Sequence, residues 1–218
     1  MTLAVVDART RTPIQEDYLV YLPGWSLERY LREAPENAFW EFVHGEVVVH
    51  SPVRIEHQRL VFFLGRVLAG YLEHVFPGAE VVLGPAGLRV APEVIREPDI
   101  FVLAPEDADK ARGFPVEARP LLVVEVVSPS TRRLDLEVKP QEYARAGIPE
   151  YWVVDEEHQQ VLRHELVGQS YHREVVPQGR VLGRSVPGFW LDVAWLWSSP
   201  RPGVEDVLSR ILQEAGDT

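Results

Sequence analysis

The stretch that decides the fold spans residues 97–155 of the 218-residue chain. It contains three apolar runs, which read IFVL at residues 100–103, LLVVEVV at 121–127 and YWVV at 151–154. Unbroken apolar runs of this length are typical of strands that are buried on both faces of a sheet. A helical pattern over residues 135–146 separates the last two runs. This order of strand, strand, helix and strand predicts the centre of a sheet that is covered by helices.

The flanking segments predict further strands and helices around this centre. Residues 39–49 have the pattern of a hairpin that turns at His44-Gly45. Ser51-Pro52 then has the form of a cap and first turn for a long helix that ends before Pro77. Alternating residues from 160 to 186 predict antiparallel strands. We therefore expect an α+β fold with an α/β-like core, in which a mixed β-sheet is flanked by helices, with an N-terminal hairpin and a C-terminal antiparallel meander.

The same patterns suggest one main domain. A chain of this length can bury a sizeable core without disulfides or metal staples. We expect an N-terminal arm over residues 1–24, the main domain over 25–197, and a C-terminal helix within 198–218 that packs on the same domain.

Composition narrows the class of protein. The net charge of −11 argues against a general nucleic-acid coat protein, although it is compatible with an enzyme that contacts nucleic acid locally. The chain has no cysteine, so Asp, Glu and His are the possible metal ligands. It shows no long apolar run and no secretory signal pattern, which predicts a cytoplasmic protein without membrane contact. Its 18 prolines and single methionine resemble the composition of a thermophile.

Two carboxylates accompany the central strands. Glu125 interrupts an apolar run, and a carboxylate buried in such a strand needs either a partner or a cation. Asp99 comes just before the preceding strand. The structural alternatives are an edge-facing or arginine-paired Glu125, and an Asp99 that only forms a turn. Together, the two acids favour a site for one divalent ion, with Mg²⁺ preferred by all-oxygen ligands and Mn²⁺ as a second candidate.

These residues resemble a known group of nucleases. Pro98-Asp99 followed by Glu125-Val126-Val127 is similar to the PD-(D/E)XK restriction-endonuclease-like superfamily, and the chain resembles its bacterial Uma-type family over roughly residues 25–195. The matching positions are Trp40–Val48, His57, Pro98-Asp99, Glu125–Thr131, Asp135, Lys139, Tyr143, Ala146–Ile148 and Glu150–Asp155. The resemblance implies a restriction-endonuclease-like fold and a Mg²⁺-dependent endonuclease that hydrolyses phosphodiester bonds, with DNA as the expected substrate.

The resemblance also implies a metal site and its ligands. Asp99, Glu125 and the backbone carbonyl of Val126 would hold the ion. Glu41, on the upstream hairpin, would add a carboxylate to the catalytic group, with Glu46 as a less favoured substitute. The ion would polarise a phosphate oxygen and lower the pKa of its bound water.

The chain departs from the superfamily pattern at the lysine. That pattern places a lysine two residues after the glutamate, where this chain has Val127. The resemblance to the Uma-type family implies that Lys139 supplies the amine from the following helix, oriented by Asp135. The structural alternative is that Lys139 only pairs with Asp135, four residues earlier on the same helix.

Other residues are candidates for secondary roles. His57 is a candidate for supporting a metal ligand or contacting a phosphate, and its structural alternative is a histidine that bonds to the helix backbone. In the loop after Glu125, Arg132, Arg133 and Ser128 are the expected contacts with the substrate phosphates.

Two further readings stay open. The first is a catalytically inactive nuclease-fold module with a binding or regulatory role, in which Val127 marks a lost activity. The second is a metal-independent glycosidase with a carboxylate pair. By resemblance, the nuclease would be a homodimer, with its contact on the 171–186 meander or on the apolar patch at residues 189–197.

Overall fold

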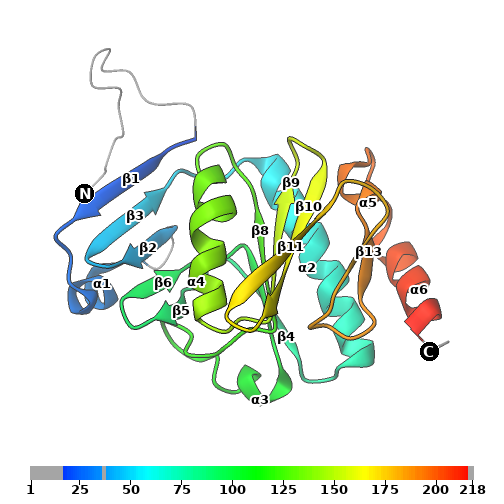
Figure 1. The fold of residues 1–218 in the computed structure, drawn as a ribbon, viewed down its shortest axis with the longest axis horizontal. Helices are drawn as coiled ribbons and strands as arrows, with labels where there is room; N and C mark the ends of the chain where they lie inside the picture. The colour runs from blue at the N-terminus through cyan, green and yellow to red at the C-terminus, as the bar shows by residue number, and fades with distance from the viewer. Residues whose placement is uncertain (1–16, 36–37, 216–218) are drawn as a thin grey trace, which may run out of the picture.

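The largest sheet has six strands and forms the centre of the computed structural model, which describes residues 17–35 and 38–215 (Figure 1). Strands β8 and β9 pair in parallel, and the other neighbours pair antiparallel, so the sheet is mixed as expected. In spatial order the strands are β11 (Ser170–Val176), β10 (Gln160–Val167), β9 (Glu150–Asp155), β8 (Leu122–Val126), β7 (Ile100–Leu103) and β4 (Glu80–Leu83).

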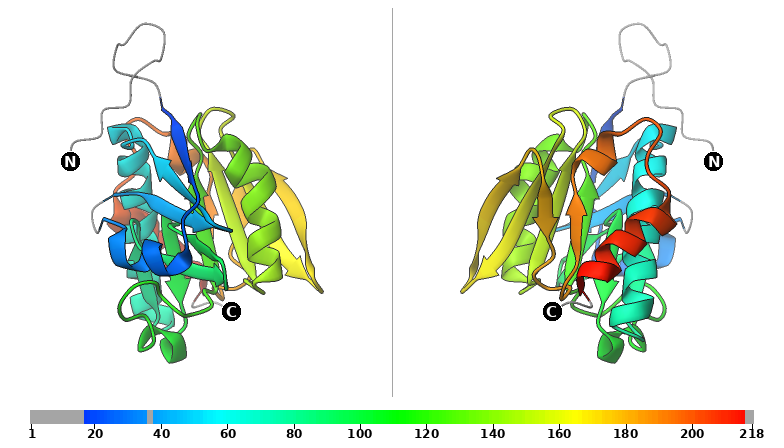
Figure 2. Two further views of the ribbon diagram at one scale, coloured as in Figure 1. Left: turned by 90° about the vertical axis from the view of Figure 1, so that its left-hand side faces the viewer. Right: turned by 90° about the vertical axis from the view of Figure 1, so that its right-hand side faces the viewer.

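Helices cover both faces of this sheet. The long helix α2 (Ile55–Val75) lies on one face with α6 (Val204–Ala215) beside it, and α4 (Lys139–Arg145) lies on the other face (Figure 2). Alternation along β8 sends Val124 into the core cluster under α2 and Val123 into the cluster under α4. The expected burial of this strand on both faces is confirmed.

A second, five-stranded sheet carries the N-terminal hairpin. The hairpin turns at His44-Gly45, where both residues have positive φ, as a two-residue turn requires. Residues 1–16 of the expected N-terminal arm (1–24) lie outside the described residues. The rest of that arm includes β1, which pairs with β3. In spatial order the strands are β1 (Leu19–Pro23), β3 (Glu46–His50), β2 (Trp40–Val43), β6 (Val94–Arg96) and β5 (Leu88–Ala91).

The C-terminal part differs from the expected meander. Strand β12 (Arg180–Leu182) pairs with β13 (Trp190–Asp192) in a separate sheet and not with β11. The apolar patch at residues 189–197, which includes the short helix α5 (Ala194–Trp197), was expected to offer a dimer contact. Most of its side chains are instead buried in the core cluster under α2, so that expectation is wrong.

Local helix boundaries follow from the sequence with one exception. The expected cap at Ser51-Pro52 is wrong, because α2 begins at Ile55 with Arg54 as its N-cap. Pro140 is the second residue of α4, which follows directly after the π-turn η1 (Leu134–Val138). The remaining helical elements are α1 (Leu27–Glu33) and α3 (Pro105–Ala108). No helix in the described ranges is long and apolar enough to cross a membrane.

Candidate active site

Strand alternation brings the two predicted acids to the same face of the sheet. Asp99 has the parity of Phe101 on β7, and Glu125 has the parity of Val123 on β8, and both of these apolar side chains pack under α4. Asp99 and Glu125 line one cleft of about 500 Å³, together with Lys139 from α4. The sequence-predicted acids and lysine therefore meet in one place, although they come from three different elements.

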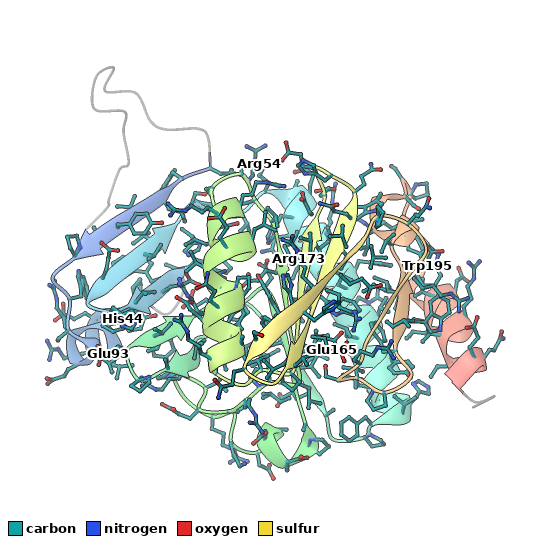
Figure 3. The ribbon with its side chains drawn as sticks, viewed as in Figure 1. His44, Arg54, Glu93, Glu165, Arg173 and Trp195 are labelled. Carbon is teal, nitrogen blue, oxygen red and sulfur yellow. The ribbon has the colours of Figure 1, made fainter. Side chains whose placement is uncertain are left out.

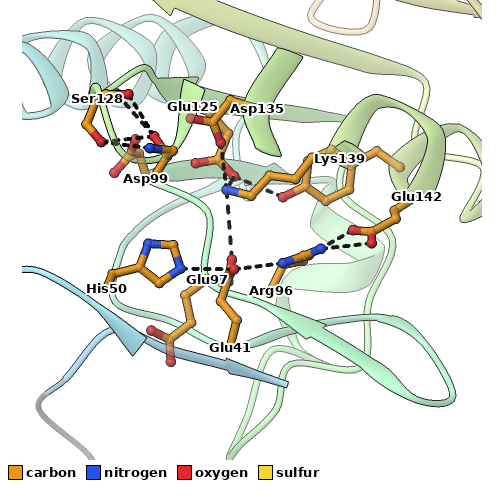
Figure 4. A network of polar contacts seen from close by, with 12 residues as sticks. Glu41, His50, Arg96, Glu97, Asp99, Glu125, Ser128, Asp135, Lys139 and Glu142 are labelled. Carbon is orange, nitrogen blue, oxygen red and sulfur yellow. Dashed lines mark hydrogen bonds and ion pairs between the residues drawn. The ribbon is translucent and has the colours of Figure 1, made fainter. Parts of the chain in front are cut away.

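The amine of Lys139 lies among carboxylates. Its Nζ atom is 2.8 Å from Glu125 Oε1, 2.9 Å from Asp135 Oδ1 and 3.8 Å from Glu41 Oε1 (Figure 4). Lys139 directly follows the π-turn η1, and the pairing with Asp135 that the sequence suggested is present alongside the contact with Glu125. Tyr143, one turn further along α4, donates a hydrogen bond to the same Oε1 atom at 3.0 Å.

Asp99 is held by two groups from other elements. His57, in the first turn of α2, places its Nε2 atom 2.9 Å from Asp99 Oδ1. The backbone N–H of Val126 donates to Asp99 Oδ2 at 2.7 Å, which links β7 to the end of β8. His57 thus contacts a predicted ligand through its side chain, as expected for a residue that supports the site.

A buried arginine ties the N-terminal sheet to α4. Arg96 donates from Nη1 to Glu41 Oε2 at 2.8 Å, and from Nε and Nη2 to Glu142 at 2.7 and 2.8 Å. His50 Nε2 lies 3.0 Å from the same Glu41 oxygen, and the backbone N–H of Glu97 donates to the other at 3.2 Å. Glu41 therefore reaches the site, but its oxygens are shared among these groups and the Lys139 amine.

Sequence reasoning missed Arg96 and His50. A signal existed for each of them. Arg96 ends the apolar strand β6 directly before the Glu97–Asp99 segment. A basic residue in a buried strand is expected to pair with an acid, because charged side chains are almost never fully buried without a partner. On β3, Val48 pairs directly with Glu41, so alternation places His50 on the same face as Glu41.

Acidic groups outnumber basic groups in the site. Its buried or half-buried ionisable groups comprise six carboxylates, of Glu41, Glu97, Asp99, Glu125, Asp135 and Glu142, against the fixed cations of Arg96 and Lys139. Burial raises the pKa of Glu125, and Asp135 and Asp99 add to this, while Lys139 opposes it. Burial also raises the pKa of Glu97 to about 8, with a further contribution from Glu41.

Nearby carboxylates raise the pKa of the basic groups of the site. Burial by itself would lower the pKa of Lys139, but the charges of Asp135, Glu125 and Glu41 hold it well above its ordinary value. Burial likewise opposes the His57 imidazolium, yet its hydrogen bond to Asp99 raises its pKa. Burial opposes the charged form of Glu41 as well, but Arg96, Lys139 and His50 keep its pKa well below the usual range.

The donor set fits a hard divalent cation. Within the described residues, Glu125 accepts two hydrogen bonds, and both go to Oε1. Its Oε2 atom is therefore the one that is left to bind a cation. Asp99 and the end of β8 line the same cleft, so oxygen ligands from two strands face one space with excess negative charge. Oxygen ligands of this kind suit Mg²⁺ or Mn²⁺.

Glu41 does not lie at the close mutual spacing with Asp99 and Glu125 that is expected of three ligands to one ion. Within residues 17–35 and 38–215, the one group of three potential ligands whose atoms all lie within 4.8 Å is Asp155, Glu157 and His158. Glu41, Asp99 and Glu125 therefore do not present oxygens at that mutual spacing. In this structure Glu41 contacts Lys139 and Arg96.

The remaining predicted residues divide between the cleft and the outer surface. Ser128 lines the cleft, and its Oγ atom lies 3.0 Å from Thr131 Oγ1 in the loop after β8. Arg133 is exposed and lies 3.6 Å from Glu137 on its own helical segment. Glu46 starts β3 beside the hairpin turn and is not among the cleft-lining residues of the described chain. Neither Arg133 nor Glu46 contributes to the cleft.

Arg132 lines the cleft but is already engaged by an acid. Its Nη1 and Nη2 atoms donate to the two carboxylate oxygens of Asp155 at 3.1 and 2.8 Å. A bidentate pair of this kind fixes the guanidinium plane. Arg132 therefore ties the loop after β8 to the end of β9, and a substrate phosphate would have to compete with Asp155 for it.

This pair predicts a loss of stability in acid. Burial opposes the Asp155 carboxylate, but hydrogen bonds from Arg132 and His158 lower its pKa to about 2. The folded-state pKa lies below the unfolded one, so the contribution of Asp155 is present above about pH 4 and is lost as the pH falls towards 2. Asp155→Asn is expected to lower the free energy of unfolding by roughly 1–2 kcal/mol at pH 6, as measured by urea unfolding.

The difference between Asp155→Asn and the parent protein is expected to disappear near pH 2. Asp109→Asn is the matched control, because the side chain of Asp109 is 93% exposed and its contact with Arg112 is long, at 3.7 Å. It is expected to leave stability unchanged at both pH values. A cost of Asp155→Asn that stays constant between pH 6 and pH 2 would contradict this account.

Comparison with known proteins gives the site a family context. A family model named Uma2, described as "Putative restriction endonuclease", matches residues 27–194. A solved structure titled as a putative nuclease from Anabaena variabilis has the same fold, with a TM-score of 0.60 and 16% sequence identity, and the match covers 85% of this chain and 98% of that one. The comparison with curated proteins finds no match. Because the family model covers most of the chain, this protein belongs to the Uma2 family of restriction-endonuclease-like fold.

Proposed function

We propose that this protein is a metal-dependent endonuclease that hydrolyses phosphodiester bonds, with DNA as its substrate. The observation that supports this most strongly is the convergence of Asp99, Glu125 and the Lys139 amine on one cleft. Membership of the Uma2 family and the fold shared with a nuclease support the same reaction class.

In this proposal, Asp99, Glu125 and the backbone carbonyl of Val126 hold one Mg²⁺ or Mn²⁺ ion. When bound, such an ion lowers the pKa of a coordinated water and polarises a phosphate oxygen. His57 and the Val126 N–H keep the carboxylate of Asp99 oriented through the hydrogen bonds that they make to its two oxygens. Tyr143 does the same for Glu125 through Oε1.

Lys139 acts in this proposal as a fixed positive charge. Because its pKa is held well above the ordinary value, the side chain stays an ammonium at neutral pH and cannot accept the proton of the attacking water. Its role is to stabilise the charge that develops on the phosphate as the water oxygen bonds to phosphorus and the bond to the ester oxygen breaks, the proton that the water loses ending on that departing oxygen. Asp135, at 2.9 Å, orients the amine.

A non-catalytic binding or regulatory module remains the second candidate. The observation that favours it is Val127, which lines the cleft at the position where the superfamily has its lysine. The homodimer and the cytoplasmic location also stay predictions. For the dimer, the remaining predicted surface is β11, which lies at one end of the six-stranded sheet and exposes Val175.

A metal-binding experiment tests the proposed site. Calorimetric titration with Mn²⁺ is expected to show one site, and Glu125→Gln is expected to weaken it at least tenfold because a neutral amide replaces a charged ligand. Cleavage of plasmid DNA is expected to stop in EDTA and to return when Mg²⁺ or Mn²⁺ is added.

Glu46→Gln is the matched control for this substitution. It makes the same chemical change at a half-buried glutamate outside the cleft, and it is expected to leave Mn²⁺ affinity and cleavage unchanged. Full cleavage in EDTA, or equal Mn²⁺ affinity for Glu125→Gln and the parent, would refute the proposed metal site.

A further inference from the structure

The outer face of α2 carries an exposed stripe of apolar and basic side chains. Ile55, Arg59, Phe62 and Arg66 follow one another at intervals of four, three and four residues, so they lie along one side of the helix. Phe62 is 58% exposed and Ile55 is 57% exposed, whereas Phe63, the next residue, is buried in the core. Large apolar side chains that are left exposed and are flanked by polar residues mark surfaces that bind a ligand or another macromolecule.

The two arginines of this stripe have no acidic partner within 4.0 Å among the described residues. Glu56 stands three residues before Arg59, at a spacing that can form helical ion pairs, but the two charged groups do not lie within 4.0 Å of each other. The positions three and four residues from Arg66 are held by Phe62, Phe63, Ala69 and Gly70, and none of them is acidic. The guanidinium of Arg66 lies over the ring of Phe62, 5.6 Å from its centroid.

Exposed arginines on other helical segments differ in this respect: Arg145 and Arg210 also have no ion pair among the described residues, whereas others form one. Arg29 pairs with Glu33 at 2.9 Å, and Arg133 lies 3.6 Å from Glu137, each four residues further along its own segment. In a chain with a net charge of −11, acidic partners are plentiful. The outer face of α2 therefore keeps two positive charges available to a negatively charged partner.

The stripe starts at the cleft. Glu56 and His57, in the first turn of α2, line the same cleft as Asp99 and Glu125. Arg59 follows two residues later, and Arg66 lies about 10 Å further along the helix axis. A chain molecule that leaves the cleft along α2 would meet the two arginines and the ring in succession.

The charges of the stripe argue against a second copy of this protein as its occupant. An antiparallel two-fold contact centred on Phe62 would set Arg59 of one copy against Arg66 of the other. Such like-charge pairs oppose association. A polyanion satisfies both arginines at once, and an exposed ring can stack on a base that is not already stacked in a duplex.

We infer that the outer face of α2 binds a single-stranded segment of nucleic acid that leaves the cleft, with Arg59 and Arg66 on phosphates and Phe62 stacked on a base. This inference rests on the proposed function, because it names the form of substrate that the same cleft would serve. The stripe lies outside the cleft and contributes to substrate affinity, not to the hydrolysis itself.

Strand binding is measured without cleavage to test the inference. In EDTA at about 50 mM salt, the fluorescence anisotropy of a labelled oligothymidylate of about 20 nucleotides reports binding. Phe62→Ala is expected to weaken binding at least fivefold, through loss of base stacking. The double variant Arg59→Ala, Arg66→Ala is expected to reduce the slope of log affinity against log salt by about 1.4.

Arg173→Ala is the matched control. Arg173 is exposed on β11, on the side of the sheet away from α2, and it has no ion pair among the described residues (Figures 1 and 3). It is expected to leave both the affinity and the salt slope unchanged. These substitutions are all at exposed side chains, so the variants are expected to fold like the parent.

The outcomes separate this inference from the proposed function. Affinity within twofold of the parent for both the Phe62 and the double arginine variants would overturn the inference. A change in oligomeric state in Phe62→Ala, seen by sedimentation without loss of strand binding, would also overturn it and assign the face to a second copy. Strand binding that depends on the stripe, in a protein that cleaves nothing with Mg²⁺ or Mn²⁺, would refute the proposed hydrolysis and leave the inference standing.

Discussion

Replacing Lys139 with methionine is expected to lower the rate of metal-dependent DNA cleavage about 1,000-fold. The amine lies 2.8 Å from Glu125 and lines the cleft, and its raised pKa keeps it charged at neutral pH. Methionine keeps a similar length and apolar stem but removes the charge that would stabilise the developing negative charge on the phosphate. The measurement is single-turnover cleavage of a plasmid at saturating Mg²⁺ or Mn²⁺.

A second substitution tests whether an amine at another position in the chain can perform the same role. Val127 follows Glu125 by two residues and therefore has the same strand parity, and it lines the cleft. When Val127→Lys is added to the Lys139→Met variant, an amine is restored at the position where the superfamily has its lysine. Recovery of tenfold or more over Lys139→Met alone is the expected result, because the amine would enter the cleft from β8 in place of α4.

The folding of these variants needs its own measurement. Lys139 is buried among Glu41, Asp135 and Glu125, so its removal leaves acidic charge without a cation and lowers stability. Cleavage is therefore compared at a temperature where circular dichroism shows each variant folded. A folded Lys139→Met protein that cleaves at the parent rate would show that the amine is structural, as the alternative pairing with Asp135 predicts.

Local rules were enough to place the strand that carries Glu125 and the helix that carries the lysine. The apolar runs around Glu125 predict a doubly buried strand. Pro140 restricts where a helix can start, and α4 begins one residue before it. These features depend on neighbours within a few positions, so the sequence displays them directly.

The contacts that complete the site depend on separations that the sequence does not display. Arg96 meets Glu41 across 55 positions and Glu142 across 46. Arg132 was expected to contact phosphate, but the carboxylate of Asp155 at the end of β9 engages it. The separation of β12 from the expected C-terminal meander has the same cause. Strand β12 could pair with either β11 or β13, and tertiary packing decides between them.

Arg96→Met is expected to lower the free energy of unfolding by about 3–5 kcal/mol. The Arg96 side chain is 2% exposed, and it is the shared partner of Glu41 on β2 and Glu142 on α4. Removing one member of a buried ion pair leaves the other charges without compensation, which costs more than the pair contributed. Urea unfolding is expected to show a lower midpoint with an unchanged dependence on urea concentration.

Arg29→Met is the control for this second substitution. Arg29 and Glu33 form an ion pair at 2.9 Å, but their side chains are 46% and 40% exposed, so the loss is expected to stay below about 1 kcal/mol. Adding Glu142→Gln to Arg96→Met is expected to restore part of the stability, because it removes the charge of Glu142, whose one ion pair among the described residues is with Arg96. A cost below about 1 kcal/mol for Arg96→Met would show that water or a shifted proton compensates Glu41 and Glu142.

The position of Arg96 connects this stability to the proposed chemistry. Arg96 holds α4 through Glu142, and α4 carries Lys139 three residues earlier, so the same guanidinium fixes the distance between the amine and Glu41. Folded Arg96→Met protein is therefore expected to cleave more slowly than Arg29→Met protein at equal folded concentration. Adding Glu142→Gln is expected to restore stability more than cleavage. The substitution removes an unpaired charge, but it does not rebuild the contact between Arg96 and Glu142 that positions α4.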